Sequence, residues 1–341
     1  MQRRGLGSKT EEAVESVKKS QDMKPLGNVV VSWKKTLSTG SDLLDLAISS
    51  GRVKGGGVPA GILLEVYGRS GSGKTSILSE LCGAAQAQGG EIAFLDPEAR
   101  LDEEYARTYG VVLPKEAYHQ PDTVTQMFDI ISKWEPKGAI NILAADSLAA
   151  LSTELELEKG DKMGMRRAKE FSEGLRKYCR KINKEGWIIA CSNQVRQGDY
   201  GDVTPGGKAV EFYASLRISV NQKEKIFKEK SFGAKGKVKR AIGIISNCIV
   251  TKSSVDKPYR EAPIIIKFDY GIDNIHGNLQ WLKDTLGLNK YMAVDKEYQR
   301  LDDAIAYIES NNLEGKLKTE VIKTWQEVED KFNQQRKPKT R

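Results

Sequence analysis

Gly68-Arg69-Ser70-Gly71-Ser72-Gly73-Lys74-Thr75 matches the pattern GxxxxGK[ST] of a phosphate-binding loop. The apolar run 62–67 before it predicts a strand, and a helix is predicted to open at Ser76. The glycines let backbone N–H groups wrap around phosphates, and the helix N-terminus adds positive potential. The Lys74 ammonium then reaches the β- and γ-phosphates, and the Thr75 hydroxyl binds Mg²⁺. All eight residues are therefore predicted to hold a nucleotide.

A second motif is the apolar segment 141–147, which ends in the acidic residue Asp146 and a serine. An acid at the end of a buried strand that follows a phosphate-binding loop is the Walker-B arrangement, which holds Mg²⁺ directly or through water. A third acid, Glu98, follows another strand candidate, at the edge where α/β sheets place their ligands. Glu98 is a candidate to orient an attacking water, and the alternative is an exposed loop carboxylate.

Apolar segments alternate with helical stretches from Leu37 to about Asn274, which predicts an α/β fold with a mostly parallel central sheet. The strand candidates are residues 62–67, 91–95, 140–145, 187–192, 216–220, 242–251 and 263–270. Segment 221–240 interrupts them and carries seven lysines and one arginine against two glutamates. We interpret this segment as a solvated hairpin or loop in preference to a nucleic-acid site.

The two ends of the chain predict appendages to a core of residues 37–275. Residues 1–36 combine a short charged helical pattern with the β-rich run 28–33, which is too little to form a core. They predict an N-terminal oligomerisation arm that docks on another subunit, or else a tail packed on its own core. Residues 276–341 predict a small α-rich lobe with helices at 301–309 and 317–332, followed by the basic tail 336–341.

The composition is that of an ordinary globular protein, with 341 residues, of which 39% are hydrophobic and 29% are charged. The longest mostly apolar stretch, residues 139–145, is far shorter than the roughly 20 residues that cross a bilayer, so we expect no membrane segment. No apolar run follows the basic N-terminus, so we expect a cytoplasmic location, or the host cytoplasm if a phage encodes the chain. Four scattered cysteines and two histidines disfavour a zinc site, a disulfide framework and a serine–histidine hydrolase. The formal net charge of +8 permits a polyanionic partner.

Beyond the phosphate-binding loop, a series of blocks resembles the bacterial-type RecA recombinases in order and spacing. The blocks lie at residues 37–41, 94–102, 105–107, 120–123, 146–151, 193–196, 206–207 and 212–217. Such a series is far more specific than a P-loop, which many unrelated NTPases share. The resemblance implies a RecA-like P-loop NTPase core and a DNA-dependent ATPase that uses ATP and Mg²⁺. It also implies a helical filament on single-stranded DNA that pairs with homologous duplex DNA and exchanges strands, with loader or single-strand-binding proteins as possible further partners.

The resemblance implies roles for individual residues as well. Glu98 resembles the glutamate that activates water, and Asp102 and Tyr105 resemble the adenine contacts. Gln194 resembles a γ-phosphate sensor at the start of the second DNA-binding loop, where a bond to the γ-phosphate biases the loop and hydrolysis removes that bond. Lys252 resembles the first of two lysines that approach the ATP phosphates from the neighbouring subunit.

DNA contacts are expected from two loops on the core, at residues 156–169 and 195–208. Arginine and lysine side chains can meet phosphates, a methionine or tyrosine can wedge between bases, and glycines admit the DNA backbone closely. The candidates are Met163, Gly164, Arg166, Arg167, Lys169, Ser172 and Arg176 in and after the first loop, and Arg196, Tyr200, Gly206 and Gly207 in the second. Either Tyr200 or Val203 would be the wedge of the second loop.

The sequence departs from the family pattern at several positions. Ser254 stands where the second inter-subunit lysine is expected, and Lys257 is a candidate substitute. Glu211 replaces the lysine expected before Phe212, which leaves the subunit-to-subunit relay open. The tail is basic where many members end in an acidic one, so restraint of DNA binding by the tail is not expected. A RecA-core ring helicase and a nucleotide-switched DNA-binding mediator with little hydrolysis are the alternative functions.

Overall fold

The computed structural model describes residues 35–159, 164–198, 201–203, 208–233, 236–333 and Arg336. All of them belong to one compact unit, residues 31–341. The predicted strand at 28–33, Met163, Tyr200, Gly206, Gly207 and the tail beyond Arg336 lie outside the described residues. The predicted N-terminal arm and the predicted boundary between core and lobe at 275 therefore stay predictions.

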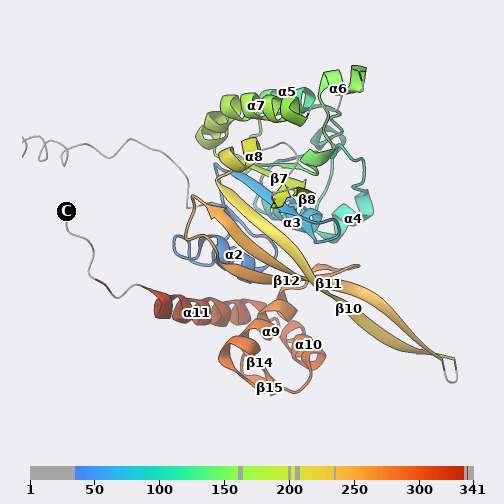
Figure 1. The fold of residues 1–341 in the computed structure, drawn as a ribbon. Helices are drawn as coiled ribbons and strands as arrows, with labels where there is room; N and C mark the ends of the chain where they lie inside the picture. Colours follow the sequence, from blue (N-terminus) through green and yellow to red (C-terminus); the bar gives the residue numbers. More distant parts are fainter. Residues whose placement is uncertain are drawn as a thin grey trace, which may run out of the picture. The chain divides into compact units, whose positions relative to one another are not determined.

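Among the described residues, the main sheet has nine strands in the order β13-β12-β11-β10-β3-β7-β6-β4-β5. Figure 1 shows β10, β11 and β12 side by side. The strands are β3 (Leu63–Gly68), β4 (Ile92–Leu95), β5 (Tyr118–His119), β6 (Ile142–Ala145), β7 (Ile188–Gln194), β10 (Leu216–Phe232), β11 (Gly236–Ser253), β12 (Glu261–Lys267) and β13 (Gly271–Ile272). The pairs from β10 to β5 are parallel, and those from β10 to β13 are antiparallel. The predicted α/β fold with a mostly parallel sheet is confirmed.

The parallel strands read as continuous apolar runs because helices cover both faces of this half of the sheet. Leu64 on β3 belongs to one core with Ile77 of α3 (Lys74–Ala87). Its neighbour Leu63 belongs to a second core with Phe128 of α5 (Val124–Lys133) and Phe171 of α7 (Gly164–Glu185). Successive strand residues thus point into opposite cores, which fixes the sheet between its helices.

The remaining elements complete the fold around this sheet. They are α2 (Asp42–Ser49), α4 (Glu103–Thr108), α6 (Glu154–Lys159), α8 (Lys208–Tyr213), α9 (Asn274–Leu286), α10 (Leu301–Ser310), α11 (Glu314–Phe332), the short turns η1 (Lys115–Ala117) and η2 (Leu148–Ala150), and the strand pairs β1 (Thr36–Leu37) with β2 (Val58–Pro59), β8 (Arg196–Gly198) with β9 (Gly201–Val203), and β14 (Tyr291–Ala293) with β15 (Lys296–Tyr298). The predicted helices at 301–309 and 317–332 are confirmed as α10 and α11. Within the described residues, no helix is both long and apolar enough to span a bilayer.

The C-terminal elements are fastened to α2 by polar contacts between residues far apart in the chain. Lys318 on α11 lies 2.6 Å from an oxygen of the buried Asp42, which also accepts hydrogen bonds from Asn274 and Asn278 of α9. The indole Nε1 of Trp325 donates to Ser50 Oγ at 3.1 Å. Lys318, Asn274 and Asn278 compensate the buried Asp42 carboxylate, so these contacts hold α9 and α11 against α2.

Segment 221–240 was predicted to interrupt the strands. In the structure it continues them. β10 and β11 pair from Leu216↔Ser253 to Phe232↔Gly236, so the backbone ladder runs far past the buried part of each strand. The interpretation as a hairpin is confirmed, and its description as a break between strands is wrong. Because paired backbone groups satisfy one another even where side chains are polar and exposed, side-chain hydropathy did not mark this continuation.

The first predicted DNA loop is mostly helical. α6 ends at Lys159 and α7 begins at Gly164, so the predicted loop 156–169 is wrong over its outer parts. The residues after Gly164 are rich in strong helix formers. Ion pairs at helical spacing, Arg166 with Glu170 at 3.5 Å and Lys169 with Glu173 at 3.9 Å, add to this preference.

Several boundaries also differ from the predictions by one to three residues. The helix after the phosphate-binding loop opens at Lys74 and not at Ser76, because Ile77 N already bonds to Gly73 O. β12 ends at Lys267, three residues before the predicted end, because the chain turns there with Tyr270 N bonded to Lys267 O.

Candidate nucleotide-binding site

The phosphate-binding loop joins the end of β3 at Gly68 to the first turn of α3 at Lys74. Gly73 has φ +99° and a Cβ there would lie 2.3 Å from Ile266 Cδ1, so only glycine fits without strain. Gly73 is the N-cap of α3, and no side chain caps the helix. The first-turn N–H groups of a 14-residue helix therefore keep their capacity to bind an anion.

Lys74 is a buried cation in this loop, with 8% of its surface exposed. Its Nζ donates to the carbonyl oxygens of Gly68 at 3.1 Å and Arg69 at 2.9 Å. In the part of the chain that the structure describes, no carboxylate lies within 4.0 Å of Lys74 Nζ. Burial lowers the pKa of Lys74, and the charges of Asp146 and Glu98 act in the opposite direction. A buried ammonium without an ion-pair partner favours an anionic ligand.

The two predicted magnesium ligands lie side by side. The Thr75 hydroxyl donates to Asp146 Oδ2 at 2.5 Å, and the Ser192 hydroxyl donates to Asp146 Oδ1. Burial raises the pKa of Asp146, while the hydrogen bonds from Ser192 and Thr75 and the charge of Lys74 oppose the shift. A hydroxyl and a carboxylate are oxygen donors of the kind that Mg²⁺ prefers, so this pair fits the metal.

Glu98 is held from three directions, and 16% of its side chain is exposed. Its Oε1 accepts hydrogen bonds from Ser147 Oγ at 2.9 Å and from Gln194 Nε2 at 3.4 Å. Its Oε2 lies 2.6 Å from Nη1 of Arg100. The interpretation as an exposed loop carboxylate is therefore wrong, and the structure brings the predicted catalytic glutamate and the predicted γ-phosphate sensor into contact.

These groups line one cavity of about 550 Å³. Of the predicted residues, the cavity is lined by Ser70, Gly71, Gly73, Lys74, Thr75, Glu98, Asp102, Tyr105, Asp146 and Gln194. The predicted adenine contact Asp102 caps α4, with its Oδ1 accepting from Tyr105 N at 2.7 Å. The Tyr105 hydroxyl lies 3.2 Å from Ser76 Oγ and 3.2 Å from the Tyr109 hydroxyl.

Three predicted loop residues, Gly68, Arg69 and Ser72, do not line the cavity. Gly68 and Arg69 contribute the carbonyl oxygens that hold Lys74, and Ser72 is buried with its carbonyl oxygen bonded to the Ser246 hydroxyl at 2.8 Å. Their contribution to the site is to shape the loop.

Sequence reasoning missed several residues of the site. Arg100 and Ser147, which hold Glu98, lie inside two of the blocks that carried the family resemblance, so they could have been found. Ser192 is a polar residue within an apolar strand, which is a weaker signal. Ile244 and Ile266 line the cavity from β11 and β12, and only the strand order brings them there.

Lys252, the predicted inter-subunit lysine, does not line this cavity in its own chain. Its Nζ donates to the carbonyl oxygens of Glu211 at 2.7 Å and Phe212 at 2.9 Å, at the end of α8. The Glu211 carboxylate lies 3.0 Å from Nη1 of Arg217. Glu211 thus belongs to a charge network within the chain, and the inter-subunit role of Lys252 stays a prediction.

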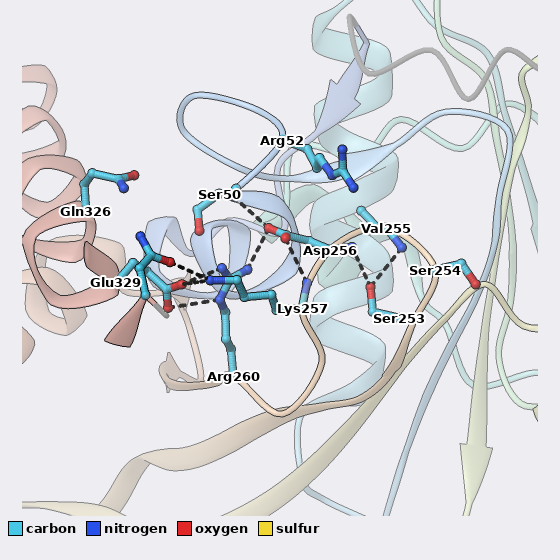
Figure 2. A pocket seen from close by; sticks show the side chains of 12 residues that line it. Ser50, Arg52, Ser253, Ser254, Val255, Asp256, Lys257, Arg260, Gln326 and Glu329 are labelled. Atoms are coloured by element: carbon cyan, nitrogen blue, oxygen red, sulfur yellow. Dashed lines mark hydrogen bonds and ion pairs between the residues drawn. The ribbon is translucent and has the colours of Figure 1, made fainter. Parts of the chain in front are cut away.

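Lys257, the candidate substitute for the second inter-subunit lysine, lines another cavity of about 520 Å³, which Figure 2 shows. Its Nζ donates to Asn333 Oδ1 at 3.0 Å and lies 3.7 Å from Glu329 Oε2. The guanidinium of Arg260 in the same cavity contacts Asp256 at 2.7 Å and Glu329 at 2.6 Å. Because carboxylates already pair with Lys257 and Arg260, these two cations join α11 to the loop before β12, and the inter-subunit role of Lys257 stays a prediction.

The cationic DNA candidates divide into two groups on α7. Arg166, Lys169 and Arg176 are exposed and recur at a spacing that keeps them on one side of the helix. Arg167 points elsewhere: its side chain is 21% exposed and its Nη2 lies 3.2 Å from Glu156 Oε2 on α6. Ser172 is partly buried. For Gly164 and Arg196 the structure describes the backbone, at the starts of α7 and β8.

Comparison with known proteins identifies the family of this chain. A family model described as RecA N-terminal domain matches residues 9–273. The chain belongs to the RecA family. Protein RecA of Rippkaea orientalis is 34% identical over 300 residues, which cover 84% of this chain and 81% of that protein. Protein RecA of Synechococcus elongatus is 35% identical over 258 residues (73% and 68%), and Protein RecA of Thermus thermophilus is 34% identical over 257 residues (73% and 72%).

Membership of the RecA family establishes the function at the level of the family. The chain is a recombinase of DNA recombination and repair and a DNA-dependent ATPase. The ring-helicase and mediator alternatives are not favoured. The family is one of nucleotide-binding ATPases that bind DNA and form filaments.

Proposed function

We propose that the cavity between the phosphate-binding loop and Glu98 binds ATP with Mg²⁺ and couples its hydrolysis to DNA binding. The observation that carries this proposal is the buried Lys74 ammonium, which has carbonyl partners but no carboxylate within ion-pair distance among the described residues. The β- and γ-phosphates would compensate this cation, and the N–H groups at the start of α3 would bind the remaining phosphate oxygens. Asp102 and Tyr105, which also line the cavity, would contact the adenine.

Thr75 and Asp146 would hold the magnesium ion. The ion, when bound, neutralises charge that develops on the phosphate oxygens. The residues of the chain perform the other tasks: Lys74 fixes the phosphates, and Glu98 orients a water and accepts its proton. Ser147 and Arg100 position the Glu98 carboxylate through contacts at 2.9 Å and 2.6 Å.

Gln194 would connect this chemistry to DNA. It is the last residue of β7, and β8 begins two residues later at Arg196. Its amide lies 3.4 Å from Glu98, a weak bond that a γ-phosphate could replace. Exchange of one partner for the other would shift the segment that follows, which gives a nucleotide-dependent change in the second DNA loop.

We infer single-stranded DNA as the first DNA partner, held in a helical filament of identical subunits, and homologous duplex DNA as the second. Arg166, Lys169, Ser172 and Arg176 on α7, with Arg167, Met163 and Gly164, would serve the first DNA site, and Arg196, Tyr200, Gly206 and Gly207 the second loop. Lys252 would reach the nucleotide of the neighbouring subunit. The exposed cations on one side of α7 support this assignment, because a row of unburied cations suits a phosphate backbone.

The test is a joint-molecule assay with single-stranded DNA, homologous duplex and ATP, run beside ATP turnover with and without single-stranded DNA. We expect turnover that single-stranded DNA stimulates and joint molecules that depend on homology. The Lys74→Ala variant is the matched control and should lose nucleotide affinity and both activities. A folded, ATP-binding wild-type protein that forms no joint molecules would overturn the proposal.

A further inference from the structure

The outer part of the β10–β11 hairpin contributes no residue to the lining of the nucleotide cavity. β3 pairs with β10 only over Leu216–Ser219, and β12 pairs with β11 only between Gly243 and Ile249. Beyond these limits the two strands pair only with each other among the described residues, and Figure 1 shows them extending past the rest of the sheet. We call residues 227–232 and 236–241 the distal ribbon.

The strand register gives the distal ribbon two faces, because directly paired residues share a face. One face carries Phe227, Glu229, Lys237 and Lys239. Lys237 Nζ lies 2.9 Å from Glu229 Oε1, and Lys239 Nζ lies 4.7 Å from the centre of the Phe227 ring. The cations of this face therefore have partners within the ribbon.

The opposite face carries Lys228, Lys230 and Arg240, all exposed, together with the exposed apolar residues Val238 and Phe232. Lys228 pairs directly with Arg240 across the strands, and like charges in that position are unfavourable. No carboxylate of the described part of the chain lies within 4.0 Å of any of the three. This cationic face is thus an uncompensated concentration of positive charge, which an anionic partner would relieve.

We propose that the cationic face of the distal ribbon binds the phosphate backbone of duplex DNA. A two-stranded β-ribbon fits the major groove, which is about 12 Å wide, and the three cations would then face phosphates at the groove edge. The ribbon needs no unstacked bases for this contact, whereas loops that wedge between bases suit single-stranded DNA. The inference rests on the proposed function, in which a second, double-stranded DNA must be taken up. It adds a contact on a part of the fold separate from α7 and from the segment after β7.

The experiment compares two double variants of the full chain that remove the same charge from the same hairpin. Lys228→Gln with Lys230→Gln alters the cationic face, and Lys237→Gln with Lys239→Gln alters the face whose cations already have partners. Affinity for a fluorescein-labelled duplex of about 30 base pairs is measured by anisotropy across about 50 to 300 mM NaCl. Each lost phosphate contact lowers the slope of log K against log salt by about 0.9, so we expect a decrease of about 1.8 for the first variant and less than half of that for the control.

The outcomes separate this inference from the proposed function. Both variants should keep ATP turnover stimulated by single-stranded DNA, since their substitutions lie outside the cavity and α7. Equal changes of the salt slope in the two variants would mean that the positive charge of the whole hairpin attracts DNA without a specific binding face. Unchanged slopes would mean that the distal ribbon does not contact DNA. Either result overturns the inference. A loss of affinity for a single strand of the same length, equal to that for the duplex, would overturn the duplex assignment. Wild-type protein without stimulated turnover would refute the proposed function and leave the duplex titration interpretable.

Discussion

Replacement of Glu98 by glutamine tests the chemistry of the cavity most directly. The substitution keeps the shape of the side chain, and its amide oxygen can still accept the hydrogen bond from Ser147 Oγ that now measures 2.9 Å. The ion pair with Arg100 is lost. Because 75% of the Arg100 side chain is exposed, we expect that loss to cost at most about 1 kcal/mol, or about fivefold in any binding constant.

The loss of the carboxylate as a proton acceptor has a much larger effect on turnover. A positioned general base contributes about 10²- to 10⁴-fold, which corresponds to roughly 3 to 5 kcal/mol of activation free energy. We therefore expect Glu98→Gln to reduce ATP turnover on single-stranded DNA by at least about a hundredfold, with affinity for a fluorescent ATP analogue changed by no more than about fivefold.

Arg100→Gln is the matched control, because it removes the same ion pair and leaves the carboxylate in place. It should lower turnover by less than about tenfold, since the Ser147 and Gln194 contacts remain. Turnover of Glu98→Gln within about tenfold of the wild type, or an equal loss in both variants, would refute the assignment of Glu98 as the base.

Three further predictions follow from buried or paired charges. Arg217→Met leaves the fully buried Glu65 without the Nε contact at 2.6 Å, so it should lower the free energy of unfolding by about 3 to 5 kcal/mol in urea, and adding Glu65→Gln should restore most of it; no restoration in the double variant would contradict the pairing. Burial raises the pKa of Glu80 to about 7 from 4.5, so the folded state binds more protons than the unfolded state between these values, and stability falls as pH rises through this window. Glu80→Gln should remove that fall, worth up to about 3 kcal/mol, and urea unfolding at about pH 5 and pH 8 that shows the same fall in both proteins would exclude Glu80 as its source. Arg166→Gln should lower the salt slope of single-stranded DNA binding by about 0.7, and Arg167→Gln by less, because Glu156 lies 3.2 Å from the Arg167 guanidinium; the reverse order in a titration would reassign the contact.

Local patterns of apolar residues predicted much of the fold. The apolar runs at 62–67, 91–95, 140–145 and 187–192 correspond to β3, β4, β6 and β7 with boundaries shifted by one or two residues. The helices at 301–309 and 317–332 were equally clear, because the spacing of apolar residues reflects the face that each helix buries. The pattern failed for 221–240, where a backbone ladder continues without a buried face, and for 156–159 and 164–169, which belong to the charged helices α6 and α7.

The composition of the candidate site was only partly visible in the chain. Lys74, Thr75 and Asp146 belong to motifs whose residue types are dictated by phosphate and magnesium, so they could be chosen from sequence. Arg100 and Ser147 hold Glu98 by side-chain contacts that no periodicity encodes. The same is true of Glu156, whose contact diverts Arg167 from the exposed cations of α7.

By itself, the amino-acid sequence determined the phosphate-binding loop, the class of fold and the family, because glycines, a lysine and hydropathy periods act through neighbouring residues. Which distant side chains meet depends instead on the order of the strands in the sheet. β3 comes first among the parallel strands in the chain but lies between β10 and β7 in the sheet. That order brings Glu65 to Arg217, 152 residues away, and Thr75 to Asp146, 71 residues away. Such contacts depend on how strands are ordered to bury both faces of the sheet, which is a property of the whole core and not of any segment.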